Sequence, residues 1–100
     1  MIGVLVPAHN EEERLAACLE SIRAAAAHPG LAGVSVRLAV ALDRCTDGSA
    51  EIARRLADDV IELQQGDVGA ARAAAAAALL DWGATWLAST DADSVVPPHW

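Results

Sequence analysis

The sequence contains no lysine, and its seven basic residues, all arginine, are outnumbered by 14 acidic residues, which gives a formal net charge of −7. A protein that binds nucleic acid needs a basic stripe to face the phosphates. The composition therefore argues against a nucleic-acid partner. An acidic chain that binds a phosphorylated ligand needs a metal ion to mediate the contact.

Cysteine is also scarce. Cys18 and Cys45 are the two cysteines in the sequence. Two cysteines are too few for a disulfide framework, and these two lack the spacing of metal ligands. We interpret both as free thiols in a reducing compartment. Cys45 has no histidine near it in the sequence that would activate it as a nucleophile.

Long apolar runs and a basic leader are missing. No stretch approaches the roughly 20 apolar residues that span a bilayer, and the alanine-rich stretch 70–80 is interrupted by Arg72. The first apolar run, residues 1–8, has no basic leader in front of it. We therefore expect a cytoplasmic protein with no membrane segment in these residues, and leave open a membrane association through residues downstream.

The rest of the sequence alternates between two patterns. Continuous apolar runs predict buried strands over residues 2–6, 34–42, 60–63 and 86–90. Apolar residues at helical spacing, or a high alanine content, predict helices over residues 11–27, 49–58 and 68–82. This order predicts an α/β fold, a Rossmann-like parallel sheet with helices on both faces and right-handed crossovers.

Local signals indicate where the helices begin and end. Asn10 and Glu13 have the spacing of a capping box, and either Thr46 or Asp47 can cap the second helix. Gly83 is placed to end the third helix.

The length allows one domain at most. Residues 95–100 read as a loop and the proline-led start of a helix that is not completed. We expect residues 1–100 to be a single domain that forms the N-terminal part of a longer protein, with its sheet truncated after the fourth strand.

A polar or glycine-rich segment follows each predicted strand. These segments are residues 7–12, 43–47, 66–69 and 91–93. In a parallel sheet all four lie along the carboxyl edge, where open α/β sheets bind ligands. Four such segments on one edge favour a nucleotide or phosphate site over plain loops.

The last of these segments contains Asp91 and Asp93, separated by one small residue. Side chains two positions apart on extended backbone share a face, so both carboxylates can point toward one ligand. Such a pair suits Mg²⁺ or Mn²⁺ shared with substrate phosphates. A solvated turn is the simpler alternative.

Four sequence motifs, taken together, resemble those of a known protein family. Val-Pro-Ala-His-Asn-Glu-Glu, Leu-Asp-Arg-Cys-Thr-Asp-Gly-Ser-Ala-Glu-Ile-Ala, Val-Gly-Ala-Ala-Arg and Thr-Asp-Ala-Asp occur in this order. The sequence resembles the inverting family 2 glycosyltransferases of the GT-A fold, over their nucleotide-sugar-binding front half. The resemblance implies transfer of a sugar from a nucleoside-diphosphate sugar, with UDP as the expected nucleotide, to an acceptor hydroxyl. The acceptor, whether saccharide, lipid or small molecule, is not indicated.

The resemblance implies roles for the residues of the base pocket. Pro7 and Ala8 would line it, Glu11 would shape its rim, and Asp43 would accept a hydrogen bond from the base. Arg72 would reach the nucleotide or steady the aspartates.

It also implies roles at the diphosphate. Asp91 would lie near the ribose and the metal, and Asp93 would hold Mg²⁺ or Mn²⁺ on the donor. The family's catalytic base lies downstream of its Asp-x-Asp motif, and no residue of this chain matches it.

The sequence departs from the family pattern at two places. Many relatives carry a second aspartate beside the one that matches Asp43, where this chain has Arg44-Cys45. Many also carry a lysine in the glycine-rich segment, where this chain has Asp67-Val68. An acid at the start of a helix is a good cap but a poor neighbour for phosphate.

Two alternatives stay open. Asp91-Ala-Asp-Ser-Val95 also satisfies the motif of haloacid-dehalogenase-type phosphatases, although that interpretation leaves residues 7–12 and Asp43 without a role. The chain could also be a non-catalytic nucleotide-binding fragment.

The histidine and tryptophan residues have plain structural interpretations. We interpret His9 as a hydrogen-bonded loop residue rather than a catalytic one. Trp82, Trp86 and Trp100 are interpreted as packing residues of the core or its rim.

Overall fold

A computed structural model of the chain describes residues 2–27 and 33–91. Within these ranges it contains four strands and three helices, and each lies within three residues of the bounds predicted for it. The elements are β1 (Ile2–Ala8), α1 (Glu12–Ala26), β2 (Val36–Asp43), α2 (Ser49–Leu56), β3 (Asp59–Leu63), α3 (Val68–Trp82) and β4 (Trp86–Ser89).

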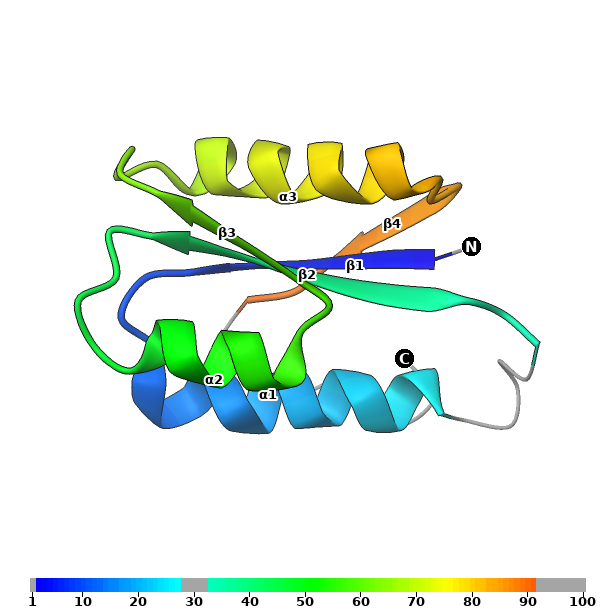
Figure 1. Cartoon of the computed structure of the whole chain (residues 1–100), viewed down its shortest axis with the longest axis horizontal. Helices are drawn as coiled ribbons and strands as arrows, with labels where there is room; N and C mark the ends of the chain where they lie inside the picture. The colour runs from blue at the N-terminus through cyan, green and yellow to red at the C-terminus, as the bar shows by residue number, and fades with distance from the viewer. Residues whose placement is uncertain (1, 28–32, 92–100) are drawn as a thin grey trace.

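The four strands form one parallel sheet in the order β3-β2-β1-β4. Helix α3 covers one face of the sheet, and α1 and α2 lie side by side on the other (Figure 1). The predicted α/β fold, with helices on both faces of a parallel sheet, is confirmed. The described part of the chain contains no helix that is long and apolar enough to cross a membrane.

The core has one layer on each side of the sheet, and the two layers differ in size. Under α1, the buried Leu15, Leu19 and Ile22 pack against valines and leucines of β1 and β2. Under α3, the buried helix residues are Ala71, Ala75 and Leu79, two of them small. Because alanine has no bulky side chain, α3 can lie close to the strands, as its composition suggested.

The closest approach of α3 to the sheet is at Gly3 of β1. A Cβ atom at this position would lie 2.9 Å from Cδ1 and 3.0 Å from Cβ of the buried Leu79. The second distance involves an atom next to the helix backbone, so the clash cannot be relieved by a rotation of the leucine side chain alone.

We therefore expect Gly3→Ala to destabilise the chain by about 1–3 kcal/mol, because α3 has to move away from β1. Urea unfolding of the purified variant measures this. In a Leu79→Ala background the added methyl group should cost less, since the leucine Cδ1 and Cγ atoms are gone. Equal costs in both backgrounds would contradict the close-packing explanation.

The structure corrects one predicted helix cap and shifts another. Glu11, not Asn10, is the N-cap of α1, and it makes no side-chain capping bond. The Asn10 side chain instead accepts a hydrogen bond from the Thr46 N–H, at 2.7 Å. Gly48 occupies the N-cap of α2, while the Asp47 side chain accepts from the N–H of Ser49 at 3.0 Å.

The ends of α3 agree with the sequence. Asp67 is the N-cap, and its carboxylate accepts from the N–H of Gly69. Gly83 ends the helix in a left-handed conformation with φ 108°, which a residue without Cβ adopts freely.

The tryptophans differ in their surroundings. Trp82 packs against the smaller core layer, and the Arg37 guanidinium lies 5.6 Å from the centre of its ring. Trp86 is 74% exposed on β4, so its interpretation as a packing residue is wrong in the described structure. There, β4 pairs with β1 and with no second strand. Trp100 lies outside the described residues.

Candidate functional site

A cavity of about 430 Å³ opens at the carboxyl edge of the sheet. Five of the residues predicted for the site line it, namely Pro7, Ala8, Glu11, Asp43 and Asp91. They come from the ends of β1, β2 and β4 and the loops that follow. The predicted convergence of these loops is therefore present, and the volume is in the range of small-molecule sites.

Asp43, the last residue of β2, forms the floor of this cavity and is only 6% exposed. Its Oδ1 accepts hydrogen bonds from the N–H groups of Gln65 at 2.8 Å and Gly66 at 3.0 Å. Its Oδ2 accepts from the N–H of Asp67 at 2.8 Å. Asp43 thus holds the loop between β3 and α3 in place, a role that the sequence did not indicate.

These bonds determine the charge state of the carboxyl group. The amide bond from Gly66, followed by those from Asp67 and Gln65, lowers the pKa of Asp43 below its ordinary value and outweighs the opposing effect of burial. Asp43 is therefore an anion at neutral pH. A carboxylate has about four acceptor positions, and three are occupied, so one remains for a ligand.

Arg72, in the second turn of α3, contacts Asp91. Its Nη2 lies 3.2 Å from Oδ1 of Asp91, and the two side chains are 46% and 66% exposed. The second carboxylate oxygen of Asp91 has no such partner among the described residues. Arg72 thus joins α3 to the segment after β4, and its predicted contact with a nucleotide stays a prediction.

The wall that contains Glu11 is fixed by bonds between two loops. Two backbone N–H groups of the loop after β2 donate to side chains of the segment after β1. The N–H of Thr46 donates to Asn10, and the N–H of Gly48 donates to the Glu12 carboxylate at 3.0 Å. The N–H of Glu11 in turn donates to the Ser49 hydroxyl at 3.1 Å. These reciprocal bonds hold both loops in one arrangement.

His9 and Cys45 lie in the same region, and neither has the surroundings of a nucleophilic pair. The His9 Nδ1–H donates to the carbonyl oxygen of Asp43 at 2.8 Å, so its interpretation as a hydrogen-bonded loop residue is confirmed. Burial raises the pKa of the Cys45 thiol, which disfavours the reactive thiolate. Neither Cys18 nor Cys45 is joined in a disulfide, as predicted.

The cavity is acidic. Among the described residues, four carboxylates, from Glu11, Asp43, Asp67 and Asp91, line it against one guanidinium, that of Arg44. Such a lining repels a diphosphate unless a cation accompanies it. The chemistry of this donor set therefore fits a hard divalent cation that arrives with a phosphorylated ligand.

Within residues 2–27 and 33–91, no group of three or more histidine, cysteine or acidic side chains is placed to cage a metal. Asp91 is the one member of the predicted metal pair that the structure describes, and Asp93 lies outside the described residues. Mg²⁺ commonly takes only one or two protein carboxylates and completes its shell with water and phosphate. A site built this way does not need a cage of three protein ligands.

The family model described as "Glycosyl transferase family 2" matches residues 3–100. No curated protein sequence matches the chain.

Among solved structures, the chain is similar to TarS from S. aureus. The TarS 1-349 structure, its complex with UDP and the TarS structure each match with a TM-score of 0.71 and 24% identity over 92% of this chain. The matched part is 27% of the 1-349 chains and 16% of the TarS chain. This chain therefore spans about a quarter or less of those proteins, and the likeness shows that the fold is shared.

Proposed function

Because the chain belongs to glycosyl transferase family 2, we propose that it binds a nucleoside-diphosphate sugar, UDP-linked in the first instance, as the donor for transfer of the sugar to an acceptor hydroxyl. The observation that carries this proposal is the single cavity that brings Asp43, at the end of β2, and Asp91, beyond β4, to the same edge of the sheet. We further propose that residues 1–100 act as one nucleotide-sugar-binding domain.

The base is proposed to bind at the Asp43 end. Pro7 and Ala8 supply an apolar wall there, and Glu11 forms the rim. The remaining acceptor position of the Asp43 carboxylate can take the imide N–H of uracil. The TarS structure that was solved with UDP bound supports UDP as the first nucleotide to test.

The diphosphate is proposed to bind at the Asp91 end. The sheet order places β1 between β2 and β4, so the ends of β2 and β4 lie two strand spacings apart, about 10 Å. A nucleoside can lie along this span with its base at Asp43 and its phosphates at Asp91. Arg72 holds the Asp91 carboxylate in position through the 3.2 Å ion pair.

Asp91 and Asp93 are proposed to hold Mg²⁺ or Mn²⁺ on the diphosphate. The bound ion would neutralise charge on the departing nucleoside diphosphate. The acidic lining of the cavity supports this proposal, because four carboxylates would otherwise repel the donor. We assign no residue of this chain as the base that deprotonates the acceptor. Because two cysteines without a disulfide fit a reducing compartment, we propose a cytoplasmic location.

Calorimetric titration of UDP into the chain, with and without Mn²⁺, tests the proposal. We expect binding that requires the metal and that falls by at least about 10-fold in Asp93→Ala, because one charged ligand of the ion is lost. Asp81→Ala is the matched control. Asp81 is exposed in the last turn of α3, away from the cavity, and its removal changes the net charge equally.

A folded wild-type chain that binds none of UDP, GDP and TDP in the presence of Mn²⁺ would contradict the donor site. The phosphatase alternative would then be tested with a generic phosphate ester. If Asp93→Ala and Asp81→Ala bound UDP with equal affinity, the nucleotide site would still be supported, but Asp93 would not be a ligand of the metal.

A further inference from the structure

We propose that Arg44 selects the nucleobase: its guanidinium donates to the base carbonyl that lies beside the N–H accepted by Asp43. The two residues would together favour bases that carry an N–H next to a C=O, namely uracil, thymine and guanine, over cytosine and adenine. This inference rests on the proposed function and adds a specificity-determining residue to it.

The backbone places Arg44 at the base end of the cavity. Arg44 follows directly on Asp43, and its φ of 55° is left-handed, a conformation uncommon for residues other than glycine. Its N–H donates to the carbonyl oxygen of Leu63 at 2.9 Å, so the turn is tied to the end of β3. A left-handed residue persists only when its surroundings hold it in place, and Arg44 is one of the residues that line the cavity.

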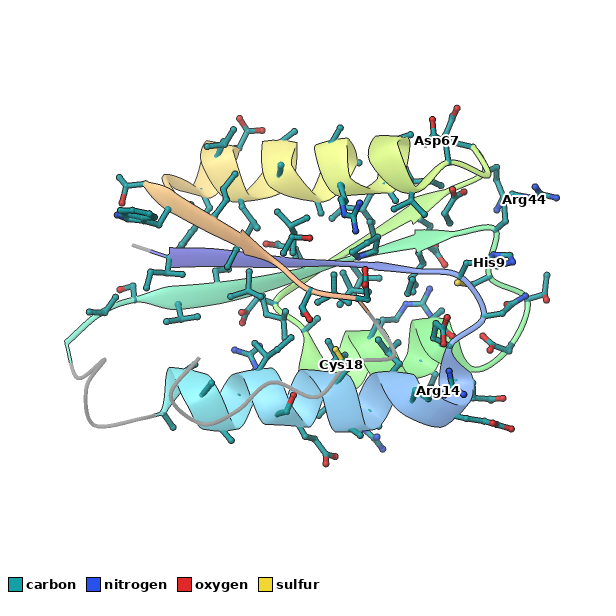
Figure 2. The ribbon with its side chains drawn as sticks, turned by 180° about the vertical axis from the view of Figure 1, so that it is seen from behind. His9, Arg14, Cys18, Arg44 and Asp67 are labelled. Atoms are coloured by element: carbon teal, nitrogen blue, oxygen red, sulfur yellow. The ribbon has the colours of Figure 1, made fainter. Side chains whose placement is uncertain are left out.

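The side chain of Arg44 lies across the loop that Asp43 holds. A Cβ atom at Gly66 would meet Nη1 of Arg44 at 2.8 Å and Cδ at 3.4 Å, so the guanidinium end passes directly over the backbone of Gly66. The N–H of Gly66 is one of the three donors to Asp43. Figure 2 shows Arg44 at the same edge of the sheet as His9 and Asp67. Asp43 and Arg44 therefore flank one short loop, the first buried and the second exposed.

The donors of Arg44 are available to a ligand. Its guanidinium makes no side-chain hydrogen bond or ion pair with the part of the chain that the structure describes, although four carboxylates line the same cavity. A guanidinium carries five N–H donors and no acceptor. Arg44 is the one arginine that the structure describes in the lining, so the base end presents an acceptor and a donor next to each other.

This pair of groups discriminates between bases. In uracil the N3–H lies between two carbonyl groups, and in guanine the N1–H lies beside the C6 carbonyl. In cytosine and adenine the corresponding ring nitrogen is an acceptor, which would face the Asp43 carboxylate without a proton between them. A site with buried polar groups rejects a ligand that leaves them unpaired.

The test is calorimetric titration of UDP and CDP, each with Mn²⁺, into the wild type, Arg44→Met and Arg44→Lys. We expect the wild type to bind UDP at least about 10-fold tighter than CDP, and Arg44→Met to lose about 10-fold in affinity for UDP while its affinity for CDP stays unchanged. Arg44→Lys keeps one charge without the planar fork and should fall in between. Arg55→Met, on the exposed face of α2, is the matched control.

Three outcomes would overturn the inference, and they are distinguishable. An equal loss of affinity for UDP and CDP in Arg44→Met would assign Arg44 to the phosphates instead. No change for either nucleotide would remove Arg44 from the site while the proposed function stands. A folded wild type that binds no nucleoside diphosphate with Mn²⁺ would overturn the donor site and this inference with it. Circular dichroism of each variant establishes that it is folded.

Discussion

Replacing Asp43 by alanine is expected to lower the melting temperature of the chain by about 10 °C or more and to abolish binding of UDP. In the wild type, the N–H groups of Gln65, Gly66 and Asp67 all donate to this one carboxylate. The alanine side chain leaves all three donors without an acceptor in a site that is 6% exposed. Thermal unfolding followed by circular dichroism measures the first effect, and titration of UDP with Mn²⁺ measures the second.

The pH dependence of stability provides an independent check. The amide bonds lower the pKa of Asp43 below the ordinary value of 3.8. A group whose pKa is lowered on folding stabilises the folded chain above its unfolded pKa, and this contribution is lost as the pH falls through the folded pKa. The gap in melting temperature between the wild type and Asp43→Asn should therefore be full at pH 6 and shrink below pH 3.8.

Asp81→Ala, which removes an exposed carboxylate of α3, should leave the melting temperature within about 2 °C of the wild type. If Asp43→Ala and Asp81→Ala melted at the same temperature, the three amide bonds would not be holding the loop.

Most of the fold could be predicted from the sequence because its local signals agree with one another. The apolar runs that became β1 and β2 are continuous, as expected for strands covered on both faces. The alanine-rich run of α3 is read as a helix on propensity alone, and Gly83 supplies the left-handed residue that ends it. Since alternation of strands and helices leaves few topologies, a parallel sheet followed.

The sequence-based predictions failed where the structure depends on contacts between residues far apart in the sequence. Asn10 has the local spacing of a cap, but its side chain accepts a hydrogen bond from the N–H of Thr46, 36 positions away. Helix α1 therefore begins without a side-chain cap. The structural role of Asp43 depends on amide groups 22 to 24 residues downstream. Backbone amides carry no residue-specific signal, and no motif could have revealed this contact. Trp86 is predicted to pack in the core or at its rim, but its side chain is exposed on β4, which pairs only with β1 in the described part of the chain.

The candidate site was predictable to the extent that topology determines it. A parallel sheet brings the loops after its strands to one edge, which places Pro7, Ala8, Asp43 and Asp91 around one cavity. The involvement of Arg44 could not be inferred in this way. It depends on the left-handed conformation of Arg44 and on the close approach of its guanidinium to Gly66, and the sequence shows neither.

The second large effect is expected at Arg72. We expect Arg72→Ala to weaken binding of UDP with Mn²⁺ by about 10- to 100-fold, because a charged hydrogen bond that positions Asp91 is lost. The same change should alter the free energy of unfolding by less than about 1 kcal/mol, since both side chains of the pair are well exposed. Calorimetric titration and urea unfolding of the same preparation measure the two quantities, and Arg55→Ala on α2 is the control for loss of one positive charge.

Arg72 could either position Asp91 or contact the nucleotide directly. Whether the loss of affinity for UDP depends on the metal distinguishes these two roles. If Arg72 acts by steadying Asp91, titration of UDP without metal should give the same weak signal for the wild type and the variant, and the difference should appear only when Mn²⁺ is added. If Arg72 contacts the nucleotide directly, the variant should bind UDP more weakly in both conditions. A variant that binds UDP with Mn²⁺ as tightly as the wild type would show that the ion pair with Asp91 has no part in donor binding.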